Sequence, residues 1–206
     1  MRDLSLHILD IAENSITAGA KKIVIRIAED EEKDVYSISV EDDGPGMDDK
    51  MRSKVEDPFF TTNGKKKFGL GLPLLKQAAL ECDGQFNVRS GTGEGTTIFA
   101  SFKRSHIDRK PLGDIGSTML ALICGHPQTR YILFYEKDGF RYGFDTDALT
   151  ESLEGMPVNI PEVLMSIRNS INESVGGRDR SKPAAGVPDC ANRQKEMKRN
   201  RRKSVE

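Results

Sequence analysis

Residues 3–18 constrain the fold most, because this segment carries two separate stripes at helical spacing. The apolar stripe follows intervals of three and four residues, which is typical of a buried helical face; it consists of Leu6, Ile8, Leu9, Ile11, Ala12, Ser15 and Ile16. The polar stripe consists of Asp3, His7, Asp10 and Asn14. Asp10 and Asn14 stand one helical turn apart and can present two oxygens to one metal ion or water molecule, as magnesium and nucleotide chemistry requires. A solvated helix edge would show the same pair.

The elements predicted after this helix follow an order that excludes one common architecture. Alternating apolar residues predict strands, and an apolar face predicts a second helix; the strands are residues 22–27, 35–40, 85–89 and 96–102, and the helix is 73–81. The order is helix, two strands, long loop, helix, two strands. A doubly wound parallel sheet alternates strictly between strands and helices, so that fold is not predicted.

The second predicted strand runs into an acidic, glycine-rich turn at residues 41–47. Gly44 and Gly46 let the backbone bend sharply and let a flat ligand approach without a Cβ in the way. A carboxylate at such a turn, here Asp42, can accept the exocyclic amino group of adenine. The same residues also form an ordinary tight turn, and the pattern alone does not separate the two interpretations.

A segment without sustained periodicity covers residues 48–67 and ends in three lysines. A connection of this length inside a compact domain is usually functional or mobile. It could act as a lid whose lysines face phosphate oxygens, or as a charged loop that faces water. Gly69 and Gly71 then precede the helix, where glycine would let phosphate oxygens reach unpaired backbone N–H groups. A tight turn requires the same residues.

Five segments together resemble the ATPase superfamily that groups DNA gyrase, Hsp90, sensor histidine kinases and MutL, known as GHKL. Residues 10–20 resemble its N box, 42–46 its first glycine box, 57–62 the F box of the kinases, 69–72 the second glycine box and 93–96 the final glycine and threonine box. The segments occur in the order of the family. The resemblance covers residues 1–104 and implies the Bergerat ATP-binding fold, an α+β two-layer α/β sandwich with helices on one face of a mixed sheet.

The resemblance also implies ATP and Mg2+ as cofactors and assigns roles to single residues. Asn14 matches the asparagine whose side-chain oxygen binds the magnesium ion that bridges the phosphates. Asp42 matches the carboxylate that recognises adenine, and Thr96 would support it. Asp10 stands four residues before Asn14, where hydrolytic members have a glutamate general base. It is therefore the candidate catalytic residue, with a side chain one methylene shorter.

Further residues are expected to border the nucleotide and its phosphates, with the loop between them acting as the ATP lid. They are Gly44, Gly46, Lys67, Gly69, Leu70 and Gly71. Lys67 occupies the position of the first glycine in the usual Gly-x-Gly-Leu-Gly pattern. The chain therefore departs from the family on this side of the lid.

Residues 105–174 are predicted to form a small α+β extension. Its elements are a helix at 112–124, a hairpin of strands 130–135 and 140–144, a short helix ending at 153 and an amphipathic helix at 160–171. The extension shows no cluster of catalytic residue types, so we expect an interaction or dimerisation module. The alternative is an extension that merely completes the ATPase core.

The charge of the chain is concentrated near its C-terminus. Residues 176–206 hold ten Lys or Arg against four Asp or Glu, a net charge of +6, and the preceding residues carry −7. A short basic run without aromatic residues is more often disordered than a nucleic-acid-binding site. We therefore predict a basic disordered tail at 175–206 and do not expect nucleic acid as a partner.

These observations predict a stand-alone, cytoplasmic Mg-ATP-binding protein. No secretory signal and no apolar run near the ~18 residues of a membrane span are present in the sequence. Only nine residues precede Asp10, too few for the phosphoacceptor hairpin of autophosphorylating kinases. Three hypotheses follow: a kinase acting in trans on a partner protein, a slow ATPase switch, and a binding module whose lid is ordered by ATP. A homodimer is a further candidate assembly.

Overall fold

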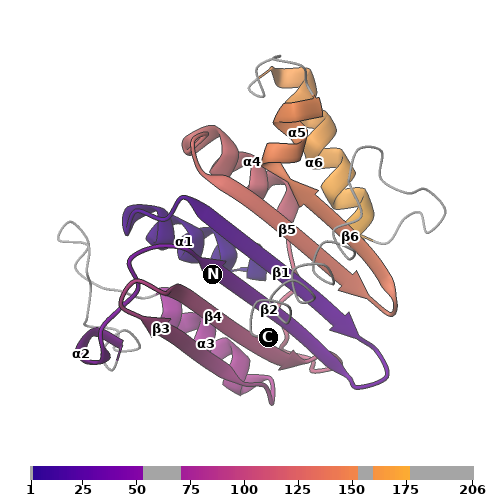
Figure 1. The fold of residues 1–206 in the computed structure, drawn as a ribbon. Helices are drawn as coiled ribbons and strands as arrows, with labels where there is room; N and C mark the ends of the chain where they lie inside the picture. The colour runs from indigo at the N-terminus through magenta and orange to yellow at the C-terminus, as the bar shows by residue number, and fades with distance from the viewer. Residues whose placement is uncertain (1, 53–70, 153–159, 177–206) are drawn as a thin grey trace, which may run out of the picture.

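The computed structural model describes residues 2–52, 71–152 and 160–176, and these form a six-stranded sheet with flanking helices (Figure 1). The strands are β1 (Lys22–Asp30), β2 (Val35–Asp42), β3 (Phe86–Gly91), β4 (Gly95–Lys103), β5 (Arg130–Lys137) and β6 (Phe140–Asp145). Their order is β3-β4-β2-β1-β5-β6. The pair β1 and β5 is parallel and the other neighbouring pairs are antiparallel. The predicted mixed sheet is confirmed.

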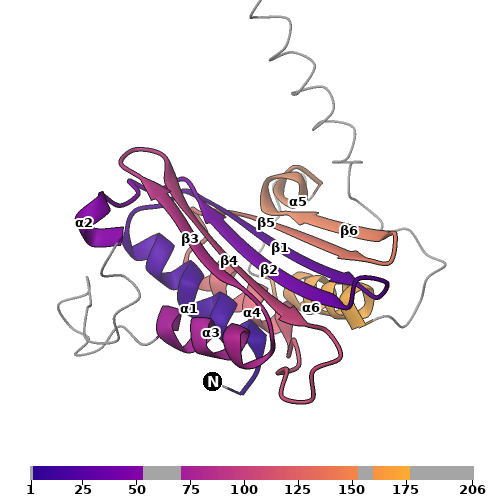
Figure 2. The same ribbon diagram turned by 90° about the horizontal axis from the view of Figure 1, so that it is seen from below.

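Most of the described helices cover one face of this sheet. The described helices are α1 (Leu4–Thr17), α2 (Asp49–Arg52), α3 (Gly71–Glu81), α4 (Ile115–Gly125), α5 (Thr146–Ser152) and α6 (Pro161–Gly176). Figure 2 shows α3, α1, α4 and α6 side by side below the sheet, while α5 lies above β5 and β6. The two-layer α+β architecture is confirmed, and α5 departs from the expectation of helices on one face, because it follows the last strand directly and packs on its other side.

Side-chain alternation explains why β1 forms at the centre of the sheet. Ile23, Ile25 and Ile27 are buried against the helices, and burial of each contributes about 2 kcal/mol. Arg26 points to the opposite face, where it pairs with Glu41 of β2 at 2.9 Å. The period of two predicted from the sequence therefore corresponds to two different environments.

The first helix begins and ends close to the predicted bounds. Asp3 is its N-cap, since its Oδ1 accepts the N–H of Leu6 at 3.1 Å. Gly19 follows the helix with φ 96° and donates its N–H to the carbonyl of Ile16 at 2.9 Å. The predicted apolar face is wrong at one position, because Leu6 is 40% exposed.

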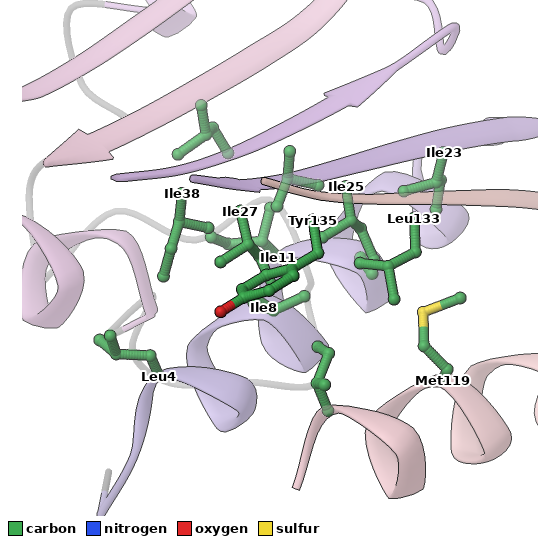
Figure 3. Close-up of a cluster of buried hydrophobic side chains, with 14 of the residues drawn as sticks. Leu4, Ile8, Ile11, Ile23, Ile25, Ile27, Ile38, Met119, Leu133 and Tyr135 are labelled. Carbon is green, nitrogen blue, oxygen red and sulfur yellow. The ribbon is translucent and has the colours of Figure 1, made fainter. Parts of the chain in front are cut away.

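One hydrophobic core joins residues 1–104 to the predicted extension. Figure 3 shows side chains of α1, β1 and β2 packed against Met119, Leu133 and Tyr135. The parallel pairing of β5 with β1 runs from Lys22↔Arg130 to Glu29↔Lys137. Residues 130–145 therefore continue the sheet, as in the alternative that the extension completes the core. The role of residues 105–174 as an interaction module stays a prediction. The predicted tail begins too early, because α6 extends to Gly176, and residues 177–206 lie outside the described residues.

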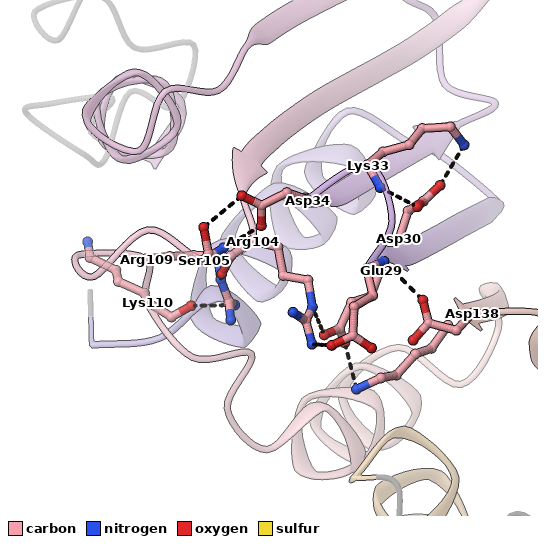
Figure 4. Close-up of polar contacts among 11 residues, drawn as sticks. Glu29, Asp30, Lys33, Asp34, Arg104, Ser105, Arg109, Lys110 and Asp138 are labelled. Carbon is pink, nitrogen blue, oxygen red and sulfur yellow. Dashed lines mark hydrogen bonds and ion pairs between the residues drawn. The ribbon is translucent and has the colours of Figure 1, made fainter.

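Ion pairs and hydrogen bonds fasten the end of the sheet where β1 turns into β2 (Figure 4). Glu29 pairs with Arg104 at 2.6 Å and with Lys137 at 3.3 Å. Asp34 accepts the hydroxyl of Ser105 at 2.6 Å. Because these charged groups have partners, this end of the sheet has a structural role. Among the described helices, none is long and apolar enough to cross a membrane.

Candidate nucleotide-binding site

Asp42 stands at the end of β2, at the opposite end of the sheet from the network of Figure 4. Its Oδ1 accepts the N–H groups of Gly44 at 2.9 Å and Thr96 at 3.2 Å. Its Oδ2 accepts the hydroxyl of Ser15 on α1 at 2.6 Å. A carboxylate has about four lone-pair positions, so three donors leave room for one more, such as an exocyclic amino group. The carboxylate is thus held by a turn, a strand and a helix.

The register of the sheet brings Thr96 to Asp42, because the two residues pair directly across β2 and β4. The neighbouring carboxylate points elsewhere: Asp43 accepts the N–H groups of Lys21 and Lys22, both at 2.8 Å. Burial acts to raise the pKa of Asp43, but these backbone donors, with the charge of Lys22, hold it below its usual value. Of the two adjacent aspartates, Asp43 therefore stabilises the start of β1. Asp42 keeps one acceptor position that a ligand could use.

Gly46 is required by packing. It has φ 68°, and an added Cβ would lie 1.9 Å from the carbonyl oxygen of Gly91. On the same side, Ser90 accepts the N–H of Met47 at 2.8 Å, and its Oγ lies 3.0 Å from the hydroxyl of Thr96. The turn after β2 is therefore fixed against the turn between β3 and β4. Contact of Gly46 with a nucleotide stays a prediction.

Asp10 and Asn14 lie together on α1, as predicted. The amide nitrogen of Asn14 donates to Asp10 Oδ2 at 3.4 Å, which leaves the amide oxygen of Asn14 for a metal ion. A Cβ added at Gly71 would lie 1.8 Å from Asp10 Oδ2. Gly71 thus permits the carboxylate to lie against the first residue of α3, where the helix dipole favours negative charge.

The structure therefore groups the predicted site residues into two ends. Asp42, Gly44, Gly46 and Thr96 lie at one end, and Asp10, Asn14 and Gly71 lie at the other. The remaining predictions, Lys67, Gly69 and Leu70, lie outside the described residues, as does the F box at 57–62.

Two serines near Asp42 were not predicted as site residues. Ser15 belongs to the apolar stripe, but it directly follows Asn14 in the N box. Its position next to a predicted magnesium ligand is the sequence signal that points to it. Ser90 carries no comparable signal, because its contacts depend on the approach of two turns that are distant in sequence.

This fold, with these two groups of residues, is that of the α+β ATPase class. The family model described as histidine kinase-, DNA gyrase B-, and HSP90-like ATPase matches residues 2–106, just over half of the chain. The chain belongs to this family, and the family resemblance predicted from the sequence is confirmed.

Known relatives include kinases. The chain is 38% identical over 98 residues to serine/threonine-protein kinase RsbT of Bacillus subtilis. The aligned region covers 47% of this chain and 68% of that protein. It is 33% identical over 90 residues to sporulation kinase C of Bacillus subtilis, which covers 44% of the chain. The match spans only about a fifth (21%) of the length of sporulation kinase C.

A solved structure with the same fold is the N-terminal domain of a DNA repair protein. It superposes with a TM-score of 0.50 at 15% identity, over 69% of this chain and 52% of that one. At this identity the likeness shows the fold alone.

Proposed function

We propose that the chain is a kinase that binds Mg-ATP and transfers the γ-phosphoryl group in trans to a partner protein. The carrying observation is the 38% identity to the serine/threonine-protein kinase RsbT, across 68% of the length of that protein. Ser and Thr are accordingly the first candidate acceptors, with His and Asp as alternatives. Because ATP is the phosphoryl donor, we place the proposed kinase in the cytoplasm. A homodimer is part of the proposal, and nucleic acid is not.

The nucleotide would lie along the edge between the two ends of the site. Adenine would donate its amino group to Asp42, and the phosphates would extend toward Asp10, Asn14 and the N-terminus of α3. Magnesium usually takes one or two protein oxygens together with phosphate oxygens and waters. The amide oxygen of Asn14 fits that role, and the described residues contain no cluster of three His, Cys, Asp or Glu side chains that would hold a metal ion alone. Lys67, Gly69 and Leu70 are proposed for the phosphate side.

Phosphoryl transfer depends mainly on positioning and on neutralising charge. Bound magnesium would supply most of that neutralisation. Asn14 would orient the metal and the phosphates, and Asp42 would fix the adenine end of the nucleotide. The carboxylate of Asp10 would accept the proton of the attacking hydroxyl. Because aspartate is one methylene shorter than glutamate, the hydroxyl of the partner protein would have to lie within hydrogen-bond distance of Asp10.

A slow ATPase that switches a partner is the second candidate. The observation that favours it is the position of the Asp10 carboxylate beside Asn14 and Gly71, where it could take a proton from water. Under this alternative Asp10→Asn abolishes release of phosphate and leaves ATP affinity intact, and no partner protein becomes labelled.

The deciding experiment is incubation of the purified chain with γ-labelled ATP and magnesium, alone and with cell extract. Label on a discrete second protein is expected, and Asn14→Ala should remove it. Asn87→Ala is the matched control, because Asn87 is exposed on β3. Free phosphate without protein label would overturn the kinase in favour of the ATPase. Measurable ATP binding with neither product would leave an ATP-gated binding module.

A further inference from the structure

Three consecutive residues of α1 contact three different side chains, two of which lie outside the helix. Asn14 contacts Asp10, and Ser15 donates to Asp42. The side chain of Glu13 instead reaches His126, with 3.3 Å between Glu13 Oε2 and His126 Nε2. His126 lies beyond residues 2–106, which match the family model. The contact therefore joins the extension to the helix that carries the proposed magnesium ligand.

The backbone of His126 is held firmly just after α4. Its N–H donates to the carbonyl of Leu122 at 2.9 Å. Its own carbonyl accepts the N–H of Thr129 at 3.1 Å and the hydroxyl of Tyr131 at 3.4 Å. Tyr131 is fully buried and also donates to the carbonyl of Leu122. The imidazole therefore extends toward Glu13 from a fixed point of the core.

The extension also holds the other end of α1. The N–H groups of Leu4 and Ser5 donate to the carbonyls of Pro111 at 3.0 Å and Leu112 at 2.7 Å. Between these ends α1 packs against α3 on one side and α4 on the other (Figure 2). The buried face of α1 packs in the core, and near the end of the helix the contacts of Glu13 and Ser15 add to that packing in setting its rotation.

Successive residues of a helix are separated by about 100° of rotation, so any rotation that moves Glu13 moves Asn14 by the same angle. We propose that His126 is a positioning residue for Mg-ATP: through Glu13 it sets the rotation of α1 and thereby the direction in which Asn14 presents its amide oxygen. This inference rests on the proposed role of Asn14. The side chains of Glu13 and His126 are 43% and 30% exposed, so loss of the contact should weaken Mg-ATP binding about 2- to 5-fold.

Isothermal titration of four proteins tests this proposal: the unaltered chain, His126→Phe, Glu13→Ala and the double variant. Each single change is expected to weaken Mg-ATP binding, and the double variant should bind no more weakly than either, because both remove one contact. His126→Gln should restore affinity, since its amide N–H can donate to Glu13. Adenosine without magnesium should be weakened less than Mg-ATP, because Asp42 keeps its two backbone donors even where Ser15 moves with α1. His106→Phe, at the other end of the molecule, is the control.

Unchanged Mg-ATP affinity in His126→Phe and Glu13→Ala would overturn the positioning role. Equal weakening of adenosine and Mg-ATP, without rescue by His126→Gln, would also overturn it and show a merely structural contact. Failure of the unaltered chain to bind Mg-ATP would overturn the proposed function itself, so the two failures are distinct. If His126→Phe does not fold, Glu13→Ala decides alone, because Glu13 is a half-exposed helix position.

Discussion

The proposed nucleotide site has an adenine end at Asp42 and a phosphate end at Asp10 and Asn14, and the two are built in different ways. At the adenine end, Asp42 accepts three hydrogen bonds of 2.6 to 3.2 Å from a helix, a turn and a strand. At the phosphate end, Asp10 and Asn14 lie on one helix and share one contact of 3.4 Å. The adenine end is held by sheet register together with Ser15 of α1, whereas the phosphate end depends mainly on how α1 is rotated. Changes elsewhere in the molecule should therefore affect the phosphate end first.

Asp42→Asn should have the largest effect, on the order of a 1,000-fold loss of ATP affinity measured by titration. With the amide oxygen turned toward the backbone donors, the amide nitrogen faces the amino group of adenine, and two donors meet. Glu41→Gln is the control, because Glu41 pairs with Arg26 on the other face of the sheet. Equal affinities for Asp42→Asn and the unaltered chain would remove Asp42 from the adenine end.

His7 should make stability depend on pH without touching either end of the site. It is 1% exposed, and neither ring nitrogen has a hydrogen-bond partner within the described part of the chain. Burial, followed by the charge of Lys110, lowers the pKa of His7 to about 4. The unfolded chain binds a proton below about pH 6.5 and the folded chain only near 4, so stability should fall by about 3 kcal/mol as pH drops through this window.

Urea unfolding of His7→Leu at pH 7 and pH 4.5 checks this expectation. The leucine variant should lose most of the acid-induced decrease in unfolding free energy, whereas His106→Asn should keep it. An identical pH dependence in His7→Leu and the unaltered chain would contradict the assignment. ATP affinity at pH 7 should stay within about twofold in both variants.

Gly46→Ala should lower the unfolding free energy by about 2 kcal/mol, because alanine is strained at φ 68° and its Cβ would collide with the carbonyl of Gly91. Gly125→Ala is the matched control. A Cβ at Gly125 meets nothing within 4 Å, and the same change at this helical position should leave stability equal or slightly higher. Thermal unfolding of both variants distinguishes a packing requirement at Gly46 from a pure ligand contact.

Ser15→Ala should have the smallest effect, a weakening of ATP affinity by about fivefold through loss of one donor to Asp42. Ser39→Ala is the control, because Ser39 lies on the same strand as Asp42 and on the face of the sheet opposite α1. A much larger loss of ATP affinity would show that the adenine end also depends strongly on the position of α1. The two ends of the site would then differ less than we infer.

Local sequence patterns predicted much of this molecule. The hairpin of β1 and β2 and the glycine turn after Asp42 depend on neighbours within a few residues, and the structure contains them. The stripes on residues 3–18 are present except at two adjacent positions, because Leu6 of the apolar stripe is exposed and His7 of the polar stripe is buried. The same applies to Asp10 and Asn14, which meet because a helix places residues four apart on one side. Family membership followed from the order of such segments.

Contacts between distant residues were decided only by the tertiary structure. The pairing of Lys22 with Arg130, the bond from Ser15 to Asp42 and the reach of His126 to Glu13 join residues 108, 27 and 113 positions apart. No local periodicity encodes which strand β5 will join, because the choice depends on which surfaces remain unburied once the hairpin and α1 have packed. The sequence by itself therefore determined most helices and strands and the types of side chain at the candidate site. Tertiary packing decided which residues of the extension contact α1, the helix that carries Asp10 and Asn14.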